Sequence, residues 1–344
     1  MVFYPEKPGD KDNEGMKKIF ISGATGFIGS RLSLRLAESG QIIHALYRSE
    51  KKAEVIRHPN IQLFRGDIMD PESVKTAVSG CSEVYHVAAF AKVWTRDPSD
   101  IYHLNIDGAM NVIRAAIDTG VRKIVLTSTA GVLGSSDGPE IDESFMPGNF
   151  YIHYEHSKAI LESVVRSLAA AGSNIVIVNP SRVYGPGLLS ESNGVTRMIK
   201  RYMEGRWRII PGNGRSIGNY VYIDDVVEGH ILAMERGKAG ERYILGGENA
   251  DYHAFFGILS EVSERKYKMV HLPLSVMMAA AYAMLFAAGL TGKSPMIIPA
   301  LVRKFHHNFP LNIMKARSEL GYRPVSLKEG ISKTLEWLKN ESNQ

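Results

Sequence analysis

The sequence predicts a doubly wound α/β fold, in which a parallel sheet is covered by helices on both faces, with a smaller and mostly helical part attached. Two observations carry this prediction. Short, strongly apolar runs alternate with longer amphipathic segments through the first 180 residues. A glycine-rich turn also separates the first apolar run from the first amphipathic segment. After Pro180 this alternation ends, and glycine and proline become frequent.

The apolar runs have the composition of strands that are buried on both faces, because neighbouring positions are apolar rather than alternately apolar and polar. We expect strands at residues 17–23, 41–48, 60–67, 83–89, 123–129 and 174–180. Between them, the periodicity predicts helices at 27–39, 71–79, 100–119 and 154–171. Pro71 after Asp70 fits a helix start, and Gly40 and Gly120 fit helix ends.

The two ends of the chain differ from this pattern. Residues 1–15 are polar, contain proline and glycine and lack an apolar core segment, so we expect a disordered tail and no secretory signal. Residues 219–248 predict a strand, a helix and a further strand that return to the sheet. Residues 251–344 are expected to be mostly helical.

Composition narrows the classes of function. The 344 residues include 41 Lys and Arg and 36 Asp and Glu, a net charge of +5 without long basic runs, which argues against nucleic-acid binding. Cys81 is the only cysteine, so no intrachain disulfide can form, and we expect a reducing, cytoplasmic location. The sequence shows no cluster with metal-ligand spacing, and we expect no metal.

One long apolar segment lies at residues 274–290 and is rich in alanine and methionine. We expect a buried or lid helix beside an apolar pocket. A helix lying on a membrane surface is the alternative. A membrane span is disfavoured, because a span takes about 20 strongly apolar residues.

The glycine-rich turn predicts dinucleotide binding. Gly23, Gly26 and Gly29 are spaced three apart between the first strand and the first helix. The first two allow a tight turn and the approach of a pyrophosphate, and the third allows close packing of the helix on the strand.

The segment after the second strand favours NADP over NAD. NAD-binding proteins commonly carry an acid there, whereas this chain has Arg48 and then Lys51 and Lys52. A guanidinium suits a 2′-phosphate by charge and geometry. Glu50 keeps NAD as the alternative, and a solvated surface loop is the other interpretation.

Several motifs in a fixed order complete the pattern, namely GATGFIG, RGDIMD, YHVAA, the Asn105–Gly108 segment, TSTAGVLG, YEHSK, NPSRVYGPG, YVYIDDVVEGH and ARSELGYRP. Through them the chain resembles the extended short-chain dehydrogenases/reductases of the NAD-dependent epimerase/dehydratase superfamily over about residues 17–340. The resemblance implies a Rossmann domain at 16–183 and 219–248 and a substrate-binding part at 184–218 and 249–340. It also implies a homodimer through helices 100–119 and 154–171.

By this resemblance, Tyr154 is the general acid/base, Lys158 is its helper, and Thr129 hydrogen-bonds the substrate oxygen, with Ser128 as the competing candidate. A free tyrosine has a pKa of about 10, and a cation one helical turn away, together with an oxidised nicotinamide, is expected to lower it. We expect His153 and His156 to point away from the phenol. Asn105 is expected to support the strand ends.

The resemblance also implies cofactor contacts at matching positions. Asp67 is expected to accept a hydrogen bond from the adenine amino group, and Ile68 to lie beside the ring. The remaining expected cofactor contacts are Gly23, Thr25, Gly26, Phe27, Ile28, Gly29, Arg48, Lys52, Ala88, Ala89, Thr127, Tyr154, Lys158, Pro180 and Val183.

Within the superfamily, the acid pair of nucleotide-sugar dehydratases is replaced by Ala130 and Gly131. The Arg-Asp pair common in nucleotide-sugar epimerases is replaced by Gly218 and Asn219, although Arg215 lies just upstream. The chain therefore looks most like the dihydroflavonol-4-reductase-like and 3β-hydroxysteroid dehydrogenase-like branch, which includes hopanoid-associated sugar epimerase-like proteins.

The residues expected around the substrate are largely apolar: Phe90, Val93, Trp94, Ser128, the segment from Tyr184 to Leu189, and helix 274–290. An apolar carbonyl compound or its alcohol suits such a lining better than a sugar. We therefore predict an NADP(H)-dependent oxidoreductase acting on such a compound. An NAD-dependent sugar or nucleotide-sugar epimerase and a catalytically idle dinucleotide sensor are the alternatives.

Overall fold

The computed structural model describes residues 17–189 and 193–342. The predicted tail at 1–15 lies outside this range. A seven-stranded sheet forms the centre of the molecule, with the strand order β10-β6-β5-β4-β1-β2-β3 and parallel pairing throughout. Its strands are β1 (Lys18–Ser22), β2 (Ile42–Tyr47), β3 (Ile61–Arg65), β4 (Glu83–His86), β5 (Lys123–Thr127), β6 (Ile175–Pro180) and β10 (Arg242–Leu245). This confirms the predicted doubly wound α/β fold.

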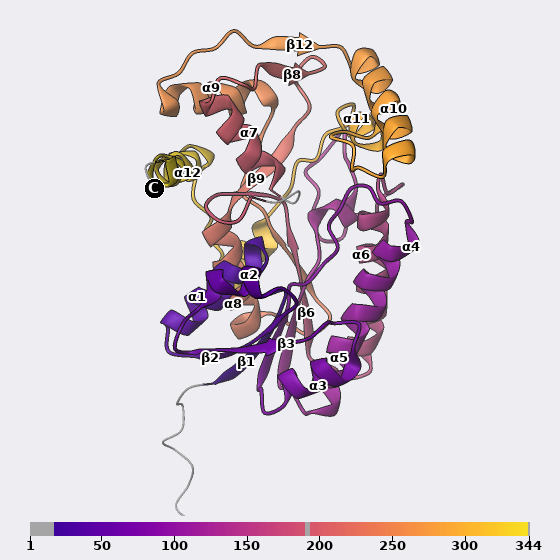
Figure 1. The fold of residues 1–344 in the computed structure, drawn as a ribbon, viewed down its shortest axis with the longest axis vertical. Coiled ribbons are helices and arrows are strands. Elements are labelled where there is room, and N and C mark those ends of the chain that lie inside the picture. The colour runs from indigo at the N-terminus through magenta and orange to yellow at the C-terminus, as the bar shows by residue number, and fades with distance from the viewer. Residues whose placement is uncertain (1–16, 190–192, 343–344) are drawn as a thin grey trace, which may run out of the picture.

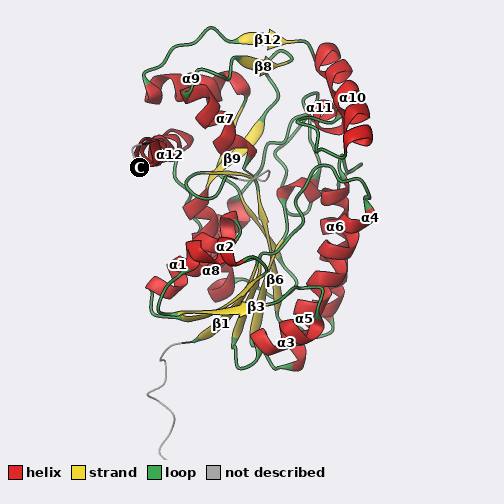
Figure 2. Ribbon diagram, in the orientation of Figure 1, coloured by secondary structure: helices red, strands yellow, loops and turns green. Residues whose placement is uncertain are grey.

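Helices cover both faces of the sheet (Figures 1 and 2). On one face, α1 (Phe27–Glu38) and α8 (Ile223–Arg236) pack with strand residues such as Ile21 and Val125. The other face is covered by α3 (Pro71–Val78), α5 (Gly108–Asp118) and α6 (His153–Ala170). These helices pack with the strand residues adjacent in sequence to the first set, such as Phe20 and Leu126. Because helices cover both faces of the sheet, the strands are apolar at successive positions.

Shorter helical pieces complete this part of the chain. The predicted helix at 100–119 consists of α4 (Ser99–Tyr102), a π-helical turn (His103–Asp107) and α5. Helix α2 (Glu50–Ala53) follows β2 and is continued by a 3₁₀ turn (Glu54–Ile56). A second 3₁₀ turn (Ala130–Leu133) follows β5, and a second π-helical turn (Ala316–Leu320) precedes α12.

The smaller part has its own sheets and its own core. Strands β7 (Arg182–Tyr184), β9 (Gly218–Tyr222) and β11 (Glu248–Ala250) form a three-stranded sheet, and β8 (Ile209–Pro211) pairs with β12 (Val270–Leu272). Its helices are α7 (Gly194–Met203), α9 (Tyr252–Ser263), α10 (Leu274–Thr291), α11 (Pro299–Lys304) and α12 (Leu327–Ser342). Of the predicted return at 219–248, only β10 joins the main sheet, whereas β9 pairs with β7 and β11.

Helix α10 departs from the expectation of a buried helix. Only Met277, Ala281 and Ala288 are buried, and 17% of the helix lies inside the molecule. The helix is apolar on all sides, and on one side it packs against the neighbouring helix α11 around Val302. Among the described residues it is the one helix with the length and composition to cross a membrane.

Candidate active site

The predicted site residues gather where the main sheet reverses its strand order, between β1 and β4. The carboxyl ends of β1, β4, β5 and β6 lie side by side there, since these strands are parallel neighbours. Thr127 ends β5, Pro180 ends β6, and α6 brings Tyr154 and Lys158 to the same end. Open α/β sheets bind ligands at this kind of position.

The glycine turn is closely packed on its neighbours. Gly23 has φ +72°, and a Cβ on it would lie 2.6 Å from the Ala88 nitrogen. A Cβ on Gly29 would lie 2.1 Å from the Gly23 oxygen, so only glycine lets α1 approach the turn this closely. A Cβ on Gly26, by contrast, would meet only the Gly23 oxygen, at 3.1 Å.

Helix α1 begins directly after this turn at Phe27. Among the described residues, no side chain caps its N-terminus and no acid lies in its first turn. Its first N–H groups and the positive end of its dipole therefore suit an anion. The turn and this helix end fit the pyrophosphate of a dinucleotide.

Lys158 lies on the second turn of α6 and is 1% exposed. Neither its Nζ nor the Oγ of buried Ser128 has a hydrogen-bond partner among the described residues. Buried polar groups normally find a partner, and an ammonium above all. Both atoms thus fit a site that is completed by a polar ligand such as a nicotinamide ribose or a substrate oxygen.

The pKa values around Tyr154 differ from the sequence-based expectation. Burial raises the pKa of the Tyr154 phenol above its ordinary value, and the charge of Glu155 raises it further. Burial also lowers the pKa of Lys158 to about 8, partly offset by Glu162. In the chain alone, burial thus outweighs the lowering expected from Lys158, because desolvation penalises the charged phenolate. The expected effect of Lys158 together with an oxidised nicotinamide stays a prediction.

The hydroxyls at the end of β5 have different surroundings. The Thr129 Oγ1 accepts a hydrogen bond of 3.1 Å from the Gly131 nitrogen, which leaves its O–H as a donor. The Thr127 Oγ1 lies 2.9 Å from Nε2 of buried His230, whose Nδ1 is 2.7 Å from the Val226 oxygen. Thr127 is thus engaged with α8, whereas Ser128 and Thr129 retain capacity for a ligand.

Asn105 ties the loop after β4 to the start of α6, as expected of a supporting residue. Its Oδ1 accepts from the Phe90 nitrogen at 2.7 Å, and its Nδ2 donates to Ser157 Oγ at 3.0 Å. Ser157 in turn donates to the Tyr154 carbonyl at 2.8 Å. The loop that carries Phe90 and Trp94 is therefore fixed relative to Tyr154.

Two buried ion pairs next to the site were missed by sequence reasoning. Glu155, 3% exposed, pairs with Lys304 of α11 and accepts from the Tyr151 nitrogen at 3.2 Å. Glu162, 1% exposed, pairs with Arg242 at 3.3 Å. The same Glu162 accepts from Asn179, whose Nδ2 also donates to the Thr129 carbonyl at 3.0 Å. These groups hold the backbone of the catalytic segments.

The end of β2 joins two residues that were predicted to have separate roles. The Arg48 Nη1 lies 3.2 Å from the Asp67 Oδ2, and both side chains are substantially exposed. Lys52 lies on the exposed last turn of α2. Ile68 packs against Gly108, where a Cβ would lie 2.8 Å from its Cδ1. Arg48 and Asp67 therefore form one polar surface at the predicted adenosine end.

His153 and His156 lie beside Tyr102, not free in solvent. The Tyr102 hydroxyl is 3.0 Å from Nδ1 of each histidine. Both histidines are nevertheless exposed. This cluster ties α4 to the first turn of α6.

The other predicted residues take varied positions. Ala88, Phe90 and Trp94 are half-buried and Ala89 is exposed in the loop after β4, while Pro180 is buried at the end of β6. Phe27 belongs to the core of the smaller part, and Thr25, Ile28 and Val183 lie around the turn and β7. The position of Tyr184 contradicts its expected role as a substrate-binding residue. Its side chain is 1% exposed, and its hydroxyl donates to the Leu327 carbonyl at 3.3 Å, so its ring fills the core.

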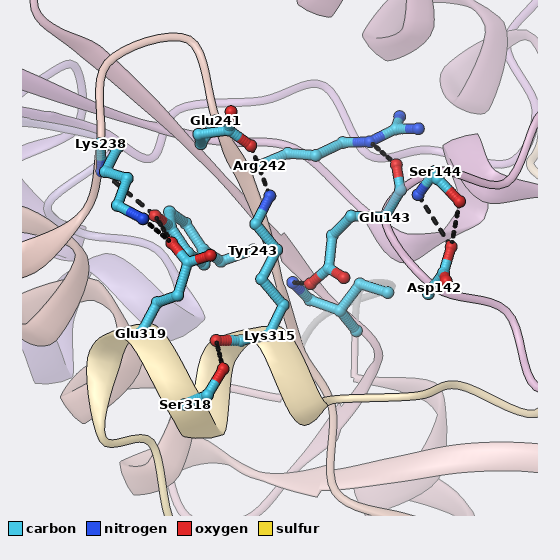
Figure 3. Close-up of polar contacts among 11 residues, drawn as sticks. Asp142, Glu143, Ser144, Lys238, Glu241, Arg242, Tyr243, Lys315, Ser318 and Glu319 are labelled. Carbon is cyan, nitrogen blue, oxygen red and sulfur yellow. Dashed lines mark hydrogen bonds and ion pairs between the residues drawn. The ribbon is translucent and has the colours of Figure 1, made fainter.

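Two hollows lie apart from this catalytic group. A cavity of about 380 Å³ is lined by Asn213, Arg215, Ser216, Leu274, Phe305, His306 and Asn308, in the smaller part beside α10 and α11. Another of about 540 Å³ includes Arg166, Arg242, Glu143 and Lys315. There, the Glu143 carboxylate accepts from the Ile244 nitrogen at 2.8 Å and the Arg242 Nε donates to the Glu143 carbonyl, so loop 142–145 covers the outer edge of β10 (Figure 3).

Comparison with known proteins identifies the family and agrees with the fold. Residues 19–246 match the family model described as "NAD dependent epimerase/dehydratase family". The chain is 30% identical to a Synechocystis protein named "Putative dihydroflavonol 4-reductase", over 93% of this chain and 94% of that protein. It is 27% identical to sterol demethylase protein B of Methylococcus capsulatus, over 93% and 97% of the two chains. The crystal structure of UDP-glucose 4-epimerase from Thermotoga maritima has a TM-score of 0.79 at 25% identity, covering 94% of this chain and 99% of that one.

Proposed function

The chain belongs to the NAD dependent epimerase/dehydratase family and is an NAD(P)-dependent oxidoreductase of the extended short-chain type, and we propose that it reduces a ketone or aldehyde of a largely apolar small molecule with NADPH. The same site would oxidise the corresponding alcohol. The observation that carries the proposal is the buried Lys158 Nζ on α6, one turn after Tyr154, which lacks a hydrogen-bond partner among the described residues.

Each of these residues has a distinct role in the proposed reaction. Tyr154 has a raised pKa and so is a protonated phenol at neutral pH, which suits it to donate a proton to a substrate oxygen. Thr129 and Ser128 orient that oxygen by hydrogen bonds. Lys158 holds a ribose hydroxyl and places a positive charge beside the phenol. When bound, the dinucleotide supplies or accepts the hydride.

The cofactor would be held along the carboxyl edge of the sheet. The glycine turn and the N-terminus of α1 receive the pyrophosphate, and the path of Ala88 and Ala89 lies beside Gly23. At the adenosine end, Arg48 and Lys52 supply positive charge for a 2′-phosphate, while Asp67 and Ile68 receive the adenine. The Arg48–Asp67 ion pair supports this assignment, since it holds the guanidinium at that end.

The substrate class follows from the half-buried aromatic residues Phe90 and Trp94 and from the reductase and sterol-pathway names of the relatives. Apolar side chains favour a ligand with few hydroxyls. An apolar carbonyl compound is therefore the substrate class that we propose.

One observation favours the epimerase alternative. Arg215, His306 and Asn308 line the same cavity beside α10 and α11. Arg215 is the residue that could replace the missing epimerase arginine, and its neighbours offer polar groups to a sugar nucleotide.

Two measurements distinguish these functions. NADPH and NADH are titrated against the protein by fluorescence, and we expect tighter NADPH binding that Arg48→Ala removes while NADH binding stays constant. Equal affinity for the two would contradict the cofactor preference. NADPH oxidation is then followed over ketones, aldehydes and sugar nucleotides. Net consumption with an apolar carbonyl supports the reductase, and conversion of a sugar nucleotide without net consumption supports the epimerase.

We also propose a homodimer through α5 and α6. Ile160 and Val164 lie one turn apart on α6, are half-buried, and belong to none of the hydrophobic clusters of the described residues. Together with Ile117 on α5, which is 42% exposed, they leave apolar surface for a second copy to cover.

A further inference from the structure

Helix α10 presents a large apolar surface to solvent. Val276 and Tyr282 are about half exposed, at 52% and 51%, and Phe286 and Leu290 are each 72% exposed. Met296, just beyond the helix, is also 72% exposed. The helix contains no charged residue among its 18 residues. Apolar patches of this kind on soluble proteins mark an interaction surface.

Basic groups border this surface. The Arg303 Nη2 lies 3.4 Å from the Tyr282 hydroxyl, and the Arg201 Nη1 lies 3.9 Å from the Met296 sulfur. A Cβ on Gly292, at the end of α10, would lie 3.1 Å from an Arg96 guanidinium nitrogen. Lys293 follows directly. We call these four residues, Arg96, Arg201, Lys293 and Arg303, the basic rim.

The stretch of sequence that contains this helix is basic. Residues 265–318 contain eight of the 41 Lys and Arg residues and none of the 36 Asp and Glu residues. The eight are Arg265, Lys266, Lys268, Lys293, Arg303, Lys304, Lys315 and Arg317. Lys304 and Lys315 are paired with Glu155 and Glu241, so the charge that borders α10 is that of the basic rim. Basic residues around an apolar helix are complementary to anionic lipid headgroups and suit a neutral protein surface less well.

The packing of α10 indicates that it lies along the protein. Met277 and Ala281 contact Val302 of α11, so one side of the helix is committed to the fold. Strand β12, just before the helix, is paired with β8, and the end of the helix meets Arg96. Figure 1 shows α10 as an outer helix beside α11. A helix held at both ends and along one side offers its opposite face to an interface, and is not free to cross a bilayer.

We propose that α10 and the basic rim bind the surface of an anionic lipid bilayer, with α10 in the plane of the interface and Phe286 and Leu290 among the acyl chains. The surface meets the loop after β4 at Arg96, the same loop that carries Phe90 and Trp94. Bilayer binding thus places the loop with the predicted substrate residues next to lipid. The binding itself does not depend on the proposed reaction.

The test is flotation of the full-length protein with vesicles. One set contains phosphatidylcholine alone, and the other contains phosphatidylcholine with phosphatidylglycerol. We expect binding to the anionic vesicles that weakens as salt is raised, and little binding to the neutral ones. Phe286→Asp with Leu290→Asp should weaken anionic-vesicle binding at least about tenfold. Lys293→Glu with Arg303→Glu should weaken it and reduce its salt dependence, since two of the four residues of the basic rim are changed.

Met146→Asp is the matched control, because Met146 is 78% exposed and lies far along the chain from α10. It should bind vesicles like the wild type, and circular dichroism checks that every variant is folded. Absence of binding to anionic vesicles would overturn the proposal. If, in addition, Phe286→Asp with Leu290→Asp turned a dimer into a monomer, a second copy of the chain would be the occupant. Equal binding to neutral and anionic vesicles would overturn the role of the basic rim.

Discussion

Lys158 is a single residue whose buried charge in the proposed site lowers the stability of the folded protein. Its side chain is 1% exposed, and its pKa falls from an ordinary value of 10.5 to about 8 because burial disfavours the charged form. Between these two pH values the unfolded chain binds more protons than the folded one. The penalty that Lys158 imposes on the stability of the protein should therefore decrease as pH increases from 8 to 10.5.

Replacing this lysine should stabilise the protein while abolishing its proposed function. We expect Lys158→Met to raise the free energy of unfolding at pH 7 by on the order of 1–3 kcal/mol, since it removes a buried charge. Denaturant unfolding at several pH values measures this. The gain should shrink as pH approaches 10.5, and Lys75→Met on the exposed face of α3 should show no such trend. A gain from Lys158→Met that stays constant between pH 7 and pH 10.5 would contradict the proposed state of Lys158.

The Glu155–Lys304 pair predicts the opposite effect. Lys304→Met leaves the carboxylate of Glu155 buried without its cation, and we expect a loss of about 1–3 kcal/mol in the free energy of unfolding. Chemical denaturation measures it, and adding Glu155→Gln to Lys304→Met should recover part of the loss. The exposed Lys333–Glu329 pair serves as the control, where Lys333→Met should cost less than about 1 kcal/mol. Equal costs at the two lysines would refute a buried pair.

At the scale of residues, the sequence allowed predictions only for groups whose members lie close together in the chain. The glycine triad and the Tyr154–Lys158 pair are such patterns, and Asn105 was recognised as a supporting residue. The pairs Glu155–Lys304, Glu162–Arg242 and Thr127–His230 are separated by 149, 80 and 103 positions, so no local pattern marks them. Tyr184 was misassigned because an aromatic residue after a strand looks the same in a core and in a pocket.

At the scale of elements, the junction of β1 and α1 is closely packed at Gly23 and Gly29. Gly29→Ala would place a Cβ 2.1 Å from the Gly23 oxygen, forcing α1 away from the turn. We expect it to destabilise the protein by roughly 1–3 kcal/mol and to weaken NADPH binding. Thermal unfolding and fluorescence titration measure the two effects.

Gly26→Ala is the matched comparison for this junction. Gly26 has φ −85°, which alanine adopts readily, and its Cβ would meet only one atom at 3.1 Å. Stability should hardly change, while NADPH binding should weaken because the new methyl group lies beside the N-terminus of α1. If Gly26→Ala destabilised the protein as strongly as Gly29→Ala, the close approach at Gly29 would not be the decisive contact.

The elements of the main sheet were predictable because burial on both faces leaves a strong apolar signal. β9 was assigned to the wrong sheet, since a five-residue apolar strand carries no information about its partner. Helix 274–290 was predicted to be a buried or lid helix, and the structure contradicts the buried form of this prediction. An alanine- and methionine-rich helix that is apolar on all sides has the same composition whether protein or lipid covers it.

At the scale of the whole molecule, the proposed homodimer has a hydrodynamic consequence. Sedimentation velocity at micromolar concentration should give about twice the chain mass of 38.1 kDa. Ile160→Glu with Val164→Glu should shift the protein to a monomer, because two carboxylates on α6 would be buried against the partner. Phe286→Asp on α10 should leave the mass unchanged. A wild-type monomer, or a dimer that only the α10 change disrupts, would refute the α5–α6 interface.

The two parts of the molecule meet at the proposed reaction centre, with Lys304 of the smaller part paired to Glu155 beside Tyr154. The most direct test of the central claim is NADPH consumption with a reactive carbonyl compound by the wild type and by Tyr154→Phe. We predict steady consumption by the wild type with formation of the alcohol, and loss of turnover by at least about a hundredfold in Tyr154→Phe with NADPH affinity nearly unchanged. Turnover retained in Tyr154→Phe would contradict the assignment of Tyr154 as the proton donor.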